Sequence, residues 1–400
     1  MTPFPDTSVQ IDAHTLQGTT GVLTIDLDAL AANWKALESR TVPAECSAVV
    51  KADAYGCGVV PVTRKLASIG CKTFFVATLD EAKRVREAAP KAAIYVLDGF
   101  FANCGDDFAK IDCRPMIGDL NELAEWDAFR RNRGWTGLAG LHIDTGMNRL
   151  GLTPDEARGL VPRIKQPDHG IALVMSHLAC AEDLSNAMNA RQLAAFRGVA
   201  SEFSGTTASL ANSSGIFLGP HFHMDMVRPG AALYGVNPTP EADSPMQPVV
   251  GLKVRIAQIR NVPKGETVGY GALWHAKRST RLAIVSAGYA DGYFRAASGI
   301  EGTRSAQAVV AGQRCPIVGR ISMDLTAIDI TDVPHAAVRR GHFITLIGEG
   351  VTLDELGHHF GTIGYEVLTS LGRRYARDYR GLVGQDSKTA SESFLDKSPA

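Results

Sequence analysis

Short apolar runs alternate with segments of helical periodicity between about residues 45 and 235. Each run ends at a polar or turn-forming residue, and eight runs follow this rule: 48–50, 74–77, 94–97, 115–117, 141–143, 172–176, 208–211 and 226–227. The amphipathic segments that separate several of them are 80–89, 119–131, 154–165 and 186–203. Strands that are buried on both faces of a parallel sheet read as continuous apolar runs. The pattern therefore predicts parallel β-structure that is covered by helices.

Eight such units favour an α/β fold of the (β/α)8 type, a TIM-like barrel, and leave an open doubly wound sheet as the alternative. In a barrel of this kind the active site forms at the carboxyl ends of the strands. The side chains that directly follow the runs are therefore the candidates for chemistry: Lys51, His177 and the segments 144–149, 212–213 and 228–230.

After about residue 245 the helical periodicity gives way to β-branched stretches that are punctuated by glycine. These stretches are 249–261, 281–286, 307–312, 315–330 and 342–348, with one helical segment at 352–360. We therefore expect a barrel over residues 20–245 and a mainly β C-terminal domain over residues 246–384, joined by the turn-rich segment 237–245. The polar, Ser-rich segment 385–400 is expected to be a disordered tail.

Composition narrows the function classes. The 400 residues carry a formal net charge of -1 and no long run of Lys or Arg, which argues against nucleic acid or an anionic membrane as a partner. No apolar stretch reaches the roughly 18 residues of a membrane helix, and the N-terminal segment lacks a signal-peptide pattern. The seven cysteines include no CxxC pair, so we expect neither disulfides nor a metal site. These features together predict a soluble cytoplasmic protein.

Lys51 is the first candidate for catalysis because it follows a strand that is expected to be buried. Desolvation beside a core lowers the pKa of a lysine and makes its amine a usable nucleophile. A strand-end lysine whose ammonium simply reaches solvent is the alternative, and the position alone favours it.

The residues around Lys51 change this balance. Residues 48–58 (AVVKADAYGCG) resemble the cofactor-lysine signature of the alanine racemase family. Further segments that resemble this family follow in order: HIDTGMNRLG (142–151), SHLA (176–179), NSS (212–214), VRPGAALYG (227–235), VGYG (268–271), GYADG (288–292), GRISMD (319–324) and YEV (365–367). The resemblance extends from about residue 20 to about residue 382. It implies a barrel followed by a β-domain, which the hydrophobic pattern predicts independently.

The resemblance implies an isomerase that uses pyridoxal 5'-phosphate (PLP) to interconvert L-alanine and D-alanine, either to supply D-alanine for peptidoglycan or to degrade it. Lys51 would bind the cofactor and act as one base, and Tyr270 from the partner subunit of a homodimer would act as the other. Two groups are needed because a proton leaves one face of Cα and returns to the opposite face. Arg228 would face the pyridine nitrogen and leave it unprotonated, because an arginine does not give up its proton in a protein.

The same resemblance assigns the remaining contacts. The phosphate would be held by hydroxyl and backbone groups of Tyr55, Ser213, Gly230, Ala231 and Tyr365. Arg149 would bind the substrate carboxylate together with the backbone of Met323 and Asp324 from the partner. His177 would lie near the cofactor ring. Tyr289 and Tyr365 would narrow the entrance, and Arg295 would form a hydrogen bond to Tyr270.

One position departs from the family pattern. His142 stands where many members have a lysine that positions the substrate-binding arginine, so the anchoring of Arg149 must differ here.

Three other functions remain as alternatives. A racemase of serine or of broader specificity depends on pocket width. A related decarboxylase of basic amino acids is disfavoured by Arg228, because a carboxylate is expected at that position. A PLP-binding homeostasis protein is disfavoured by the second domain.

Overall fold

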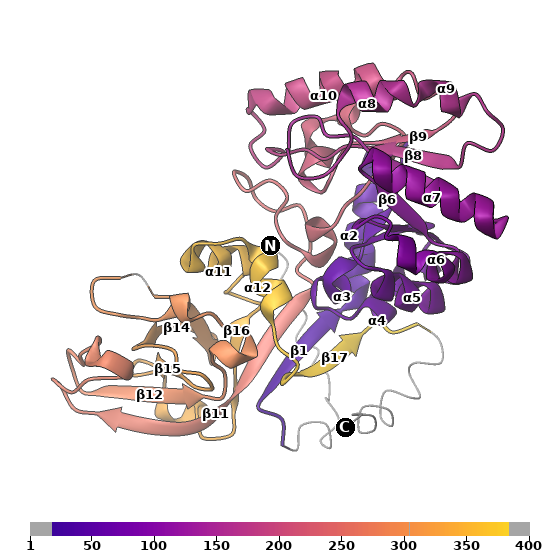
Figure 1. Cartoon of the computed structure of the whole chain (residues 1–400). Helices are drawn as coiled ribbons and strands as arrows, with labels where there is room; N and C mark the ends of the chain where they lie inside the picture. The colour runs from indigo at the N-terminus through magenta and orange to yellow at the C-terminus, as the bar shows by residue number, and fades with distance from the viewer. Residues whose placement is uncertain (1–17, 304, 384–400) are drawn as a thin grey trace. The chain divides into compact units, whose positions relative to one another are not determined.

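The computed structural model describes residues 18–303 and 305–383, which form two compact units (Figure 1). The barrel unit is Leu27–Gln247, and the β unit is Pro248–Arg380 together with the segment that ends at Asp26. In the described part of the chain, no helix combines the length and the apolar composition that a membrane crossing requires. The tail predicted at residues 385–400 lies outside the described residues.

The barrel unit contains a parallel sheet whose order is β2-β10-β9-β8-β7-β6-β5-β4-β3. The two end strands, β2 and β3, are neighbours in the chain and are separated only by Ser47, so they act as one interrupted strand. β2 pairs with β10 and β3 pairs with β4, which closes the sheet. The strands are β2 (Glu45–Cys46), β3 (Ala48–Val49), β4 (Thr73–Val76), β5 (Ala93–Val96), β6 (Arg114–Ile117), β7 (Ala139–His142), β8 (Ile171–Met175), β9 (Thr207–Ser209) and β10 (Met226–Val227). The predicted (β/α)8 barrel is therefore confirmed, and the open sheet is excluded.

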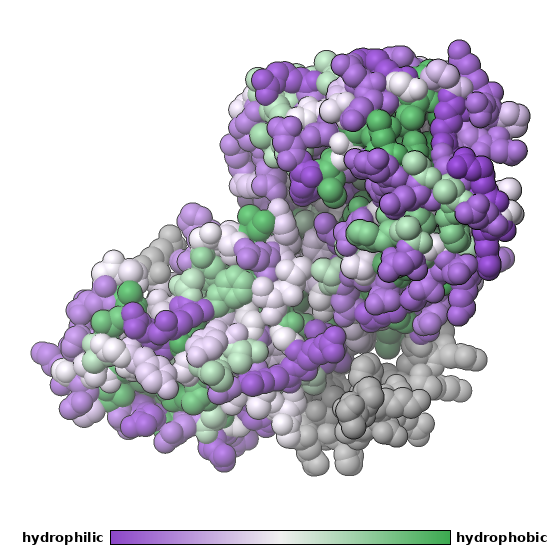
Figure 2. Space-filling model, viewed as in Figure 1, coloured by the Kyte–Doolittle hydropathy of each residue, from purple (hydrophilic) through white to green (hydrophobic). Residues whose placement is uncertain are grey.

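Helices cover the outside of these strands (Figure 1). They are α2 (Leu27–Thr41), α4 (Val59–Ser68), α5 (Leu79–Ala88), α6 (Gly105–Ile111), α7 (Leu120–Arg133), α8 (Pro154–Gly159), α9 (Val161–Ile164) and α10 (Ala187–Ala200). The prediction of a single helix at 154–165 is wrong. The segment divides at Leu160, because Pro162 has no N–H to continue the helical hydrogen bonds. On the face of this unit that Figure 2 shows, most of the surface is hydrophilic, and the apolar residues form separate patches.

The interior of the barrel is filled by side chains from most of its strands. Val49, Phe75, Tyr95, Met116, Leu173, Met175 and Met226 form one buried cluster. The rings of Phe75 and Tyr95 stack with their centroids 5.0 Å apart. A barrel filled in this way is a packed core, so ligands can enter only at its ends.

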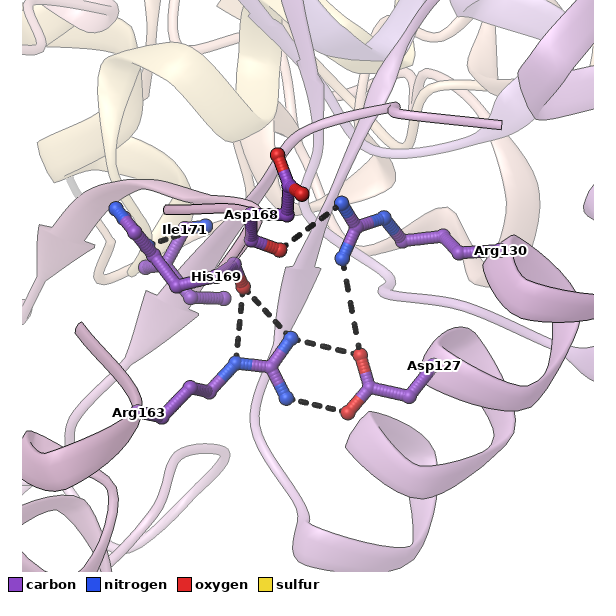
Figure 3. A network of polar contacts seen from close by, with 6 residues as sticks. All are labelled: Asp127, Arg130, Arg163, Asp168, His169 and Ile171. Carbon is purple, nitrogen blue, oxygen red and sulfur yellow. Dashed lines mark hydrogen bonds and ion pairs between the residues drawn. The ribbon is translucent and has the colours of Figure 1, made fainter. Parts of the chain in front are cut away.

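A network of arginine contacts holds the amino end of β8 (Figure 3). Arg163 forms two hydrogen bonds to the Asp127 carboxylate and donates to the carbonyl of His169 at 2.7 and 2.9 Å. The Nδ1 atom of His169 accepts from the Ile171 N–H at 3.1 Å. Arg130 donates to the Asp168 carbonyl at 3.4 Å. These bonds fix the start of β8, and so the strand that leads to His177 at the opposite end of the barrel.

The β unit contains one sheet in the order β12-β15-β14-β13-β16-β11-β1-β17. Its elements are β1 (Gly21–Asp26), β11 (Val250–Val262), β12 (Thr280–Val285), β13 (Gln307–Val310), β14 (Gln313–Val318), β15 (Thr326–Asp329), β16 (Phe343–Ile347), β17 (Ala376–Arg380), and the helices α11 (Leu353–Phe360) and α12 (Gly364–Ser370). All pairings are antiparallel except that of β1 with β17.

The N-terminal strand corrects one expected boundary. Residues 21–26 were expected in the barrel, but β1 pairs with β11 and β17 and so belongs to the β unit. Both of its partners lie more than 200 residues away along the chain. Periodicity reports which face of a strand is buried but says nothing of such a distant partner.

Candidate active site

Lys51 lies directly after β3 and begins an unusual turn. The four residues that follow it, 52–55, all have left-handed backbone conformations with φ between 53° and 55°. None of the four is a glycine, and this conformation costs an L-residue about 1–2 kcal/mol. The short helix α3 (Lys51–Tyr55) is therefore in large part a left-handed turn. Strain of this kind persists where the surrounding structure enforces it, which is common at functional sites.

Asp53 and helix α5 enforce this conformation. The Oδ1 atom of Asp53 accepts from the Val59 N–H at 2.9 Å and pairs with Arg84 at 2.9 Å. The backbone N–H of Asp53 donates to the Glu81 carboxylate at 3.2 Å. Helix α5 therefore fixes the backbone that follows Lys51 and helps to define where its amine can reach.

The surroundings of Lys51 favour the neutral amine. Burial lowers the pKa of Lys51, and the positive charge of Arg149 lowers it further, while Asp98 and Glu81 partly oppose this shift. The residue as a whole is half-buried. A lowered pKa makes the amine of a lysine a better nucleophile and proton acceptor near neutral pH.

Arg228 supplies a second positive charge, at the carboxyl end of β10. It is 4% exposed, donates to Ser209 Oγ at 2.5 Å and to the Ser176 carbonyl at 2.6 Å, and lies 5.9 Å from the ring centroid of Phe75. Burial lowers its pKa to about 10, so it stays cationic at neutral pH. Because these acceptors are uncharged, its charge is available to a ligand. A buried cation with only neutral partners is costly, which makes the position a candidate functional site.

The strand-end histidines are neutral in this environment. His142 ends β7 and is buried, and desolvation together with Arg228 and Arg149 lowers its pKa to about 4. His177 follows β8, and desolvation together with the same two arginines lowers its pKa to about 3. Neither imidazole adds a positive charge to the site at physiological pH.

These two depressed pKa values predict a loss of stability in mild acid. An unfolded histidine titrates near pH 6.5, so between that pH and the folded pKa the unfolded chain binds more protons. The contribution of these histidines to the free energy of unfolding is therefore fully present above pH 6.5. It decreases as the pH falls toward the folded pKa of about 4 for His142 and about 3 for His177. His142 alone contributes on the order of 3 kcal/mol to this pH-dependent part of the free energy of unfolding.

Melting temperatures measured from pH 7.5 to 4.5 should fall less steeply for His142→Gln than for the wild type. The exposed His335→Gln control should follow the wild type, and equal slopes for all three proteins would contradict the assignment.

Two hydroxyl groups meet at the bare Cα of Gly230. The ring of Tyr55 stacks on Tyr234 with 4.6 Å between centroids. A Cβ atom on Gly230 would lie only 2.4 Å from the Tyr55 hydroxyl. Ser213 Oγ accepts from the N–H groups of Gly230 at 2.9 Å and Ala232 at 3.2 Å. The barrel thus brings together Tyr55, Ser213 and Gly230, with Ala231 next in the chain, whereas Tyr365 lies on α12 of the β unit.

Arg149 is exposed and lies on a loop that is closed at its base by a bridge between Ile143 and Leu152. Inside the loop, the Asp144 carboxylate accepts from the N–H groups of Gly146, Met147 and Asn148 at 2.8–3.2 Å. Sequence reasoning missed Asp144 as a determinant of this loop. The Asp-x-Gly spacing was the available signal, because an aspartate readily accepts hydrogen bonds from the backbone that follows it.

The other candidates lie on the β unit. Tyr270 begins the turn η5 (Tyr270–Ala272) and is 69% exposed. Gly269 and Gly271, on either side of it, have φ near +80°, and a Cβ on Gly269 would lie 2.9 Å from the Arg320 nitrogen. This close approach gives a reason for the glycine at position 269. It also makes Arg320, which sequence reasoning did not single out, the neighbour of this turn.

Tyr289, Met323 and Asp324 lie close together through their backbones. Tyr289 N–H donates to the Ser322 carbonyl at 3.1 Å, and Ala290 N–H donates to the Met323 carbonyl at 3.0 Å. The Asp324 carboxylate pairs with Arg374 at 2.6 Å. Arg295 is exposed in the short turn η7 (Arg295–Ala297), and within the described residues it forms no hydrogen bond to Tyr270. Its proposed support of Tyr270 therefore stays a prediction.

Comparisons with known proteins agree with this arrangement. Residues 25–238 match the family model of the alanine racemase N-terminal domain, and residues 249–379 match that of the C-terminal domain. Alanine racemases from Methylobacterium sp. (strain 4-46) and Methylobacterium nodulans are 53% and 52% identical, over 89% of this chain and 97% and 95% of their own lengths. The crystal structure of alanine racemase from Bartonella henselae with covalently bound pyridoxal phosphate has a TM-score of 0.84 at 37% identity, covering 90% of this chain and 99% of that one. This chain belongs to the alanine racemase family.

Proposed function

We propose that this protein is a PLP-dependent alanine racemase that interconverts L-alanine and D-alanine. One observation carries the proposal: the carboxyl end of the barrel combines a lysine of lowered pKa, Lys51, with two arginines, Arg149 and Arg228. These two positive charges lower the pKa values of the nearby histidines. A small zwitterionic amino acid and an anionic cofactor both require such positive charge. The family relationship identifies the reaction.

The residues present fit PLP. Lys51 offers the amine that holds the cofactor covalently, and Arg228 offers a permanent cation to the pyridine nitrogen. The hydroxyl groups of Tyr55 and Ser213, which converge at Gly230, would hold the phosphate, because neutral donors hold a dianion when enough of them converge. When bound, PLP supplies the electron sink that makes the α-hydrogen of an amino acid acidic.

Two side chains of the protein move the proton. Lys51 as a neutral amine accepts or returns it on one face of Cα, and Tyr270 does so on the opposite face through its hydroxyl. Arg149 orients the substrate by its carboxylate, with help from the backbone of Met323 and Asp324. Arg228 would face the pyridine nitrogen of bound PLP as a cation that does not give up its proton, and so would disfavour protonation of that nitrogen.

We infer that the active enzyme is a homodimer in which the β unit of one subunit completes the site of the other. The β unit exposes several large apolar side chains, namely Tyr270 (69%), Tyr289 (44%), Met323 (51%), Leu325 (43%) and Ile363 (41%). Surfaces of this kind mark interfaces when they are contiguous. The backbone bonds between residues 289–290 and 322–323 make Tyr289 and Met323 neighbours on this surface.

We also infer that the enzyme works in the cytoplasm. All seven cysteines are free thiols, and five of them are buried. Free thiols persist in a reducing compartment.

The holoenzyme incubated with L-alanine should produce D-alanine until the two enantiomers are close to a 1:1 ratio. Chiral chromatography measures both, and the reverse reaction from D-alanine should reach the same ratio. L-serine in parallel tests for broader specificity, and an equal rate with serine would replace alanine as the assigned substrate. Release of CO2 without a D-isomer would establish a decarboxylase and contradict the proposal.

A further inference from the structure

A polar network joins the Arg149 loop to the segment that carries His177, and Gln192 lies at its centre. Gln192 is fully buried on α10. Its Oε1 accepts from the Ala179 N–H at 2.9 Å, and its Nε2 donates to the His177 carbonyl at 2.9 Å and to Thr145 Oγ1 at 3.3 Å. One amide therefore uses its acceptor and both of its N–H groups on three separate partners.

Thr145 extends this network to Arg228. The hydroxyl oxygens of Thr145 and Ser176 are 2.7 Å apart. Because Thr145 Oγ1 accepts from Gln192, its own proton is available to Ser176. Ser176 is 1% exposed, and its carbonyl accepts from Arg228 at 2.6 Å. A continuous path of short contacts thus runs from Gln192 through Thr145 and Ser176 to Arg228.

The loop that bears Arg149 is rigid enough to transmit this constraint. Asp144 N–H donates to the Leu152 carbonyl and Leu152 N–H donates to the His142 carbonyl, both at 2.8 Å. The Asp144 carboxylate holds the residues that lie between Thr145 and Arg149, as described above. A loop closed at its base and bonded inside moves as one body, so fixing Thr145 also fixes the backbone of Arg149.

We propose that Gln192 is a positioning residue that, through Thr145, holds the Arg149 loop at a fixed distance from Arg228. It thereby sets the separation between the site for the substrate carboxylate and the site for the cofactor ring. This proposal rests on the racemase function proposed above. The proposal also explains why residue 192 has an amide side chain. A carboxylate could not donate to Thr145 or to the His177 carbonyl, and a hydrocarbon side chain would leave these buried groups unpaired.

Conservative variants test the proposal in the PLP-loaded enzyme. Thr145→Val removes the hydroxyl at constant volume, Thr145→Ser keeps it, and Gln192→Glu removes both donors at constant shape. Asn189→Asp is the matched control: Asn189 is 3% exposed on the same helix, and its amide donates to the Cys180 and Asp183 carbonyls, away from Thr145. Four quantities are measured: KM and kcat for L-alanine, the Kd of propionate (a carboxylate without an amine), the visible spectrum of bound PLP, and Tm.

Thr145→Val and Gln192→Glu should raise KM and the propionate Kd by about three- to tenfold, which is the effect of losing one buried hydrogen bond. The kcat and the PLP spectrum should change little, and Thr145→Ser should restore the wild-type KM. Asn189→Asp should lower Tm without changing KM. If Thr145→Val and Gln192→Glu lower Tm but leave KM and propionate binding at wild-type values, the network is only structural and the proposal is wrong. A wild-type holoenzyme that fails to racemise alanine overturns the proposed function instead, and the propionate Kd still tests the network.

Discussion

Lys51→Ala is expected to lose at least about a thousandfold in racemisation rate in both directions, because it removes both the amine that holds PLP and one of the two bases. The physical basis is the position of Lys51 at the end of β3, where burial and Arg149 lower the pKa of its amine. Chiral chromatography measures the rate. Borohydride reduction followed by peptide mass analysis should find reduced PLP on the peptide of residue 51 in the wild type only.

Lys83→Ala is a suitable control for this experiment. Lys83 lies on α5 of the same unit and pairs with Asp80 and Asp107 at the surface. Its removal should leave both the rate and the labelled peptide unchanged. Labelling of a different lysine in the wild type would overturn the assignment of Lys51.

Tyr270→Phe is expected to keep PLP and to lose about 10²–10⁴-fold in racemisation, the usual contribution of one positioned acid–base group. The loss should be unequal when solvent deuterium incorporation is followed by NMR. The enantiomer whose α-proton faces Lys51 should still exchange, while the other should not. Equal loss of exchange from both enantiomers would contradict the two-base assignment. Tyr379→Phe, which changes a tyrosine of β17 in the same unit, is the control and should be fully active.

Mixing the two inactive proteins tests whether the site is shared between subunits. If Lys51 of one subunit works with Tyr270 of the other, a hybrid dimer has one site with both residues intact and one with neither. Partial activity should then return after the Lys51→Ala and Tyr270→Phe proteins are unfolded and refolded together. If both residues of a site came from one chain, every site in the hybrid would carry one defect, and the activity would not rise above that of the Tyr270→Phe protein.

The sequence by itself determined the barrel, because its strands are buried on both faces and each appears as a short apolar run. The predicted run that precedes Lys51 corresponds to β3, and that before Arg228 corresponds to β10. Since parallel strands of a barrel present their carboxyl ends together, the same pattern also brought Lys51, His177 and Arg228 to one end. The motif order then identified the family, which the comparisons show.

Only the tertiary structure decided features that depend on distant partners. Residues 52–55 include alanine and tyrosine, which have no preference for left-handed conformations, and the turn exists because Glu81 and Arg84 on α5 hold Asp53. Strand β1 joined the β unit because β11 and β17 offered the edges it pairs with. Gln192 reads as an ordinary polar position on an amphipathic helix. The role proposed for it depends on folding, which places its amide among Thr145, His177 and Ala179, separated from it by 13 to 47 residues. Local preferences are encoded in neighbouring residues, whereas hydrogen bonds of this kind form only after the fold has brought distant segments together.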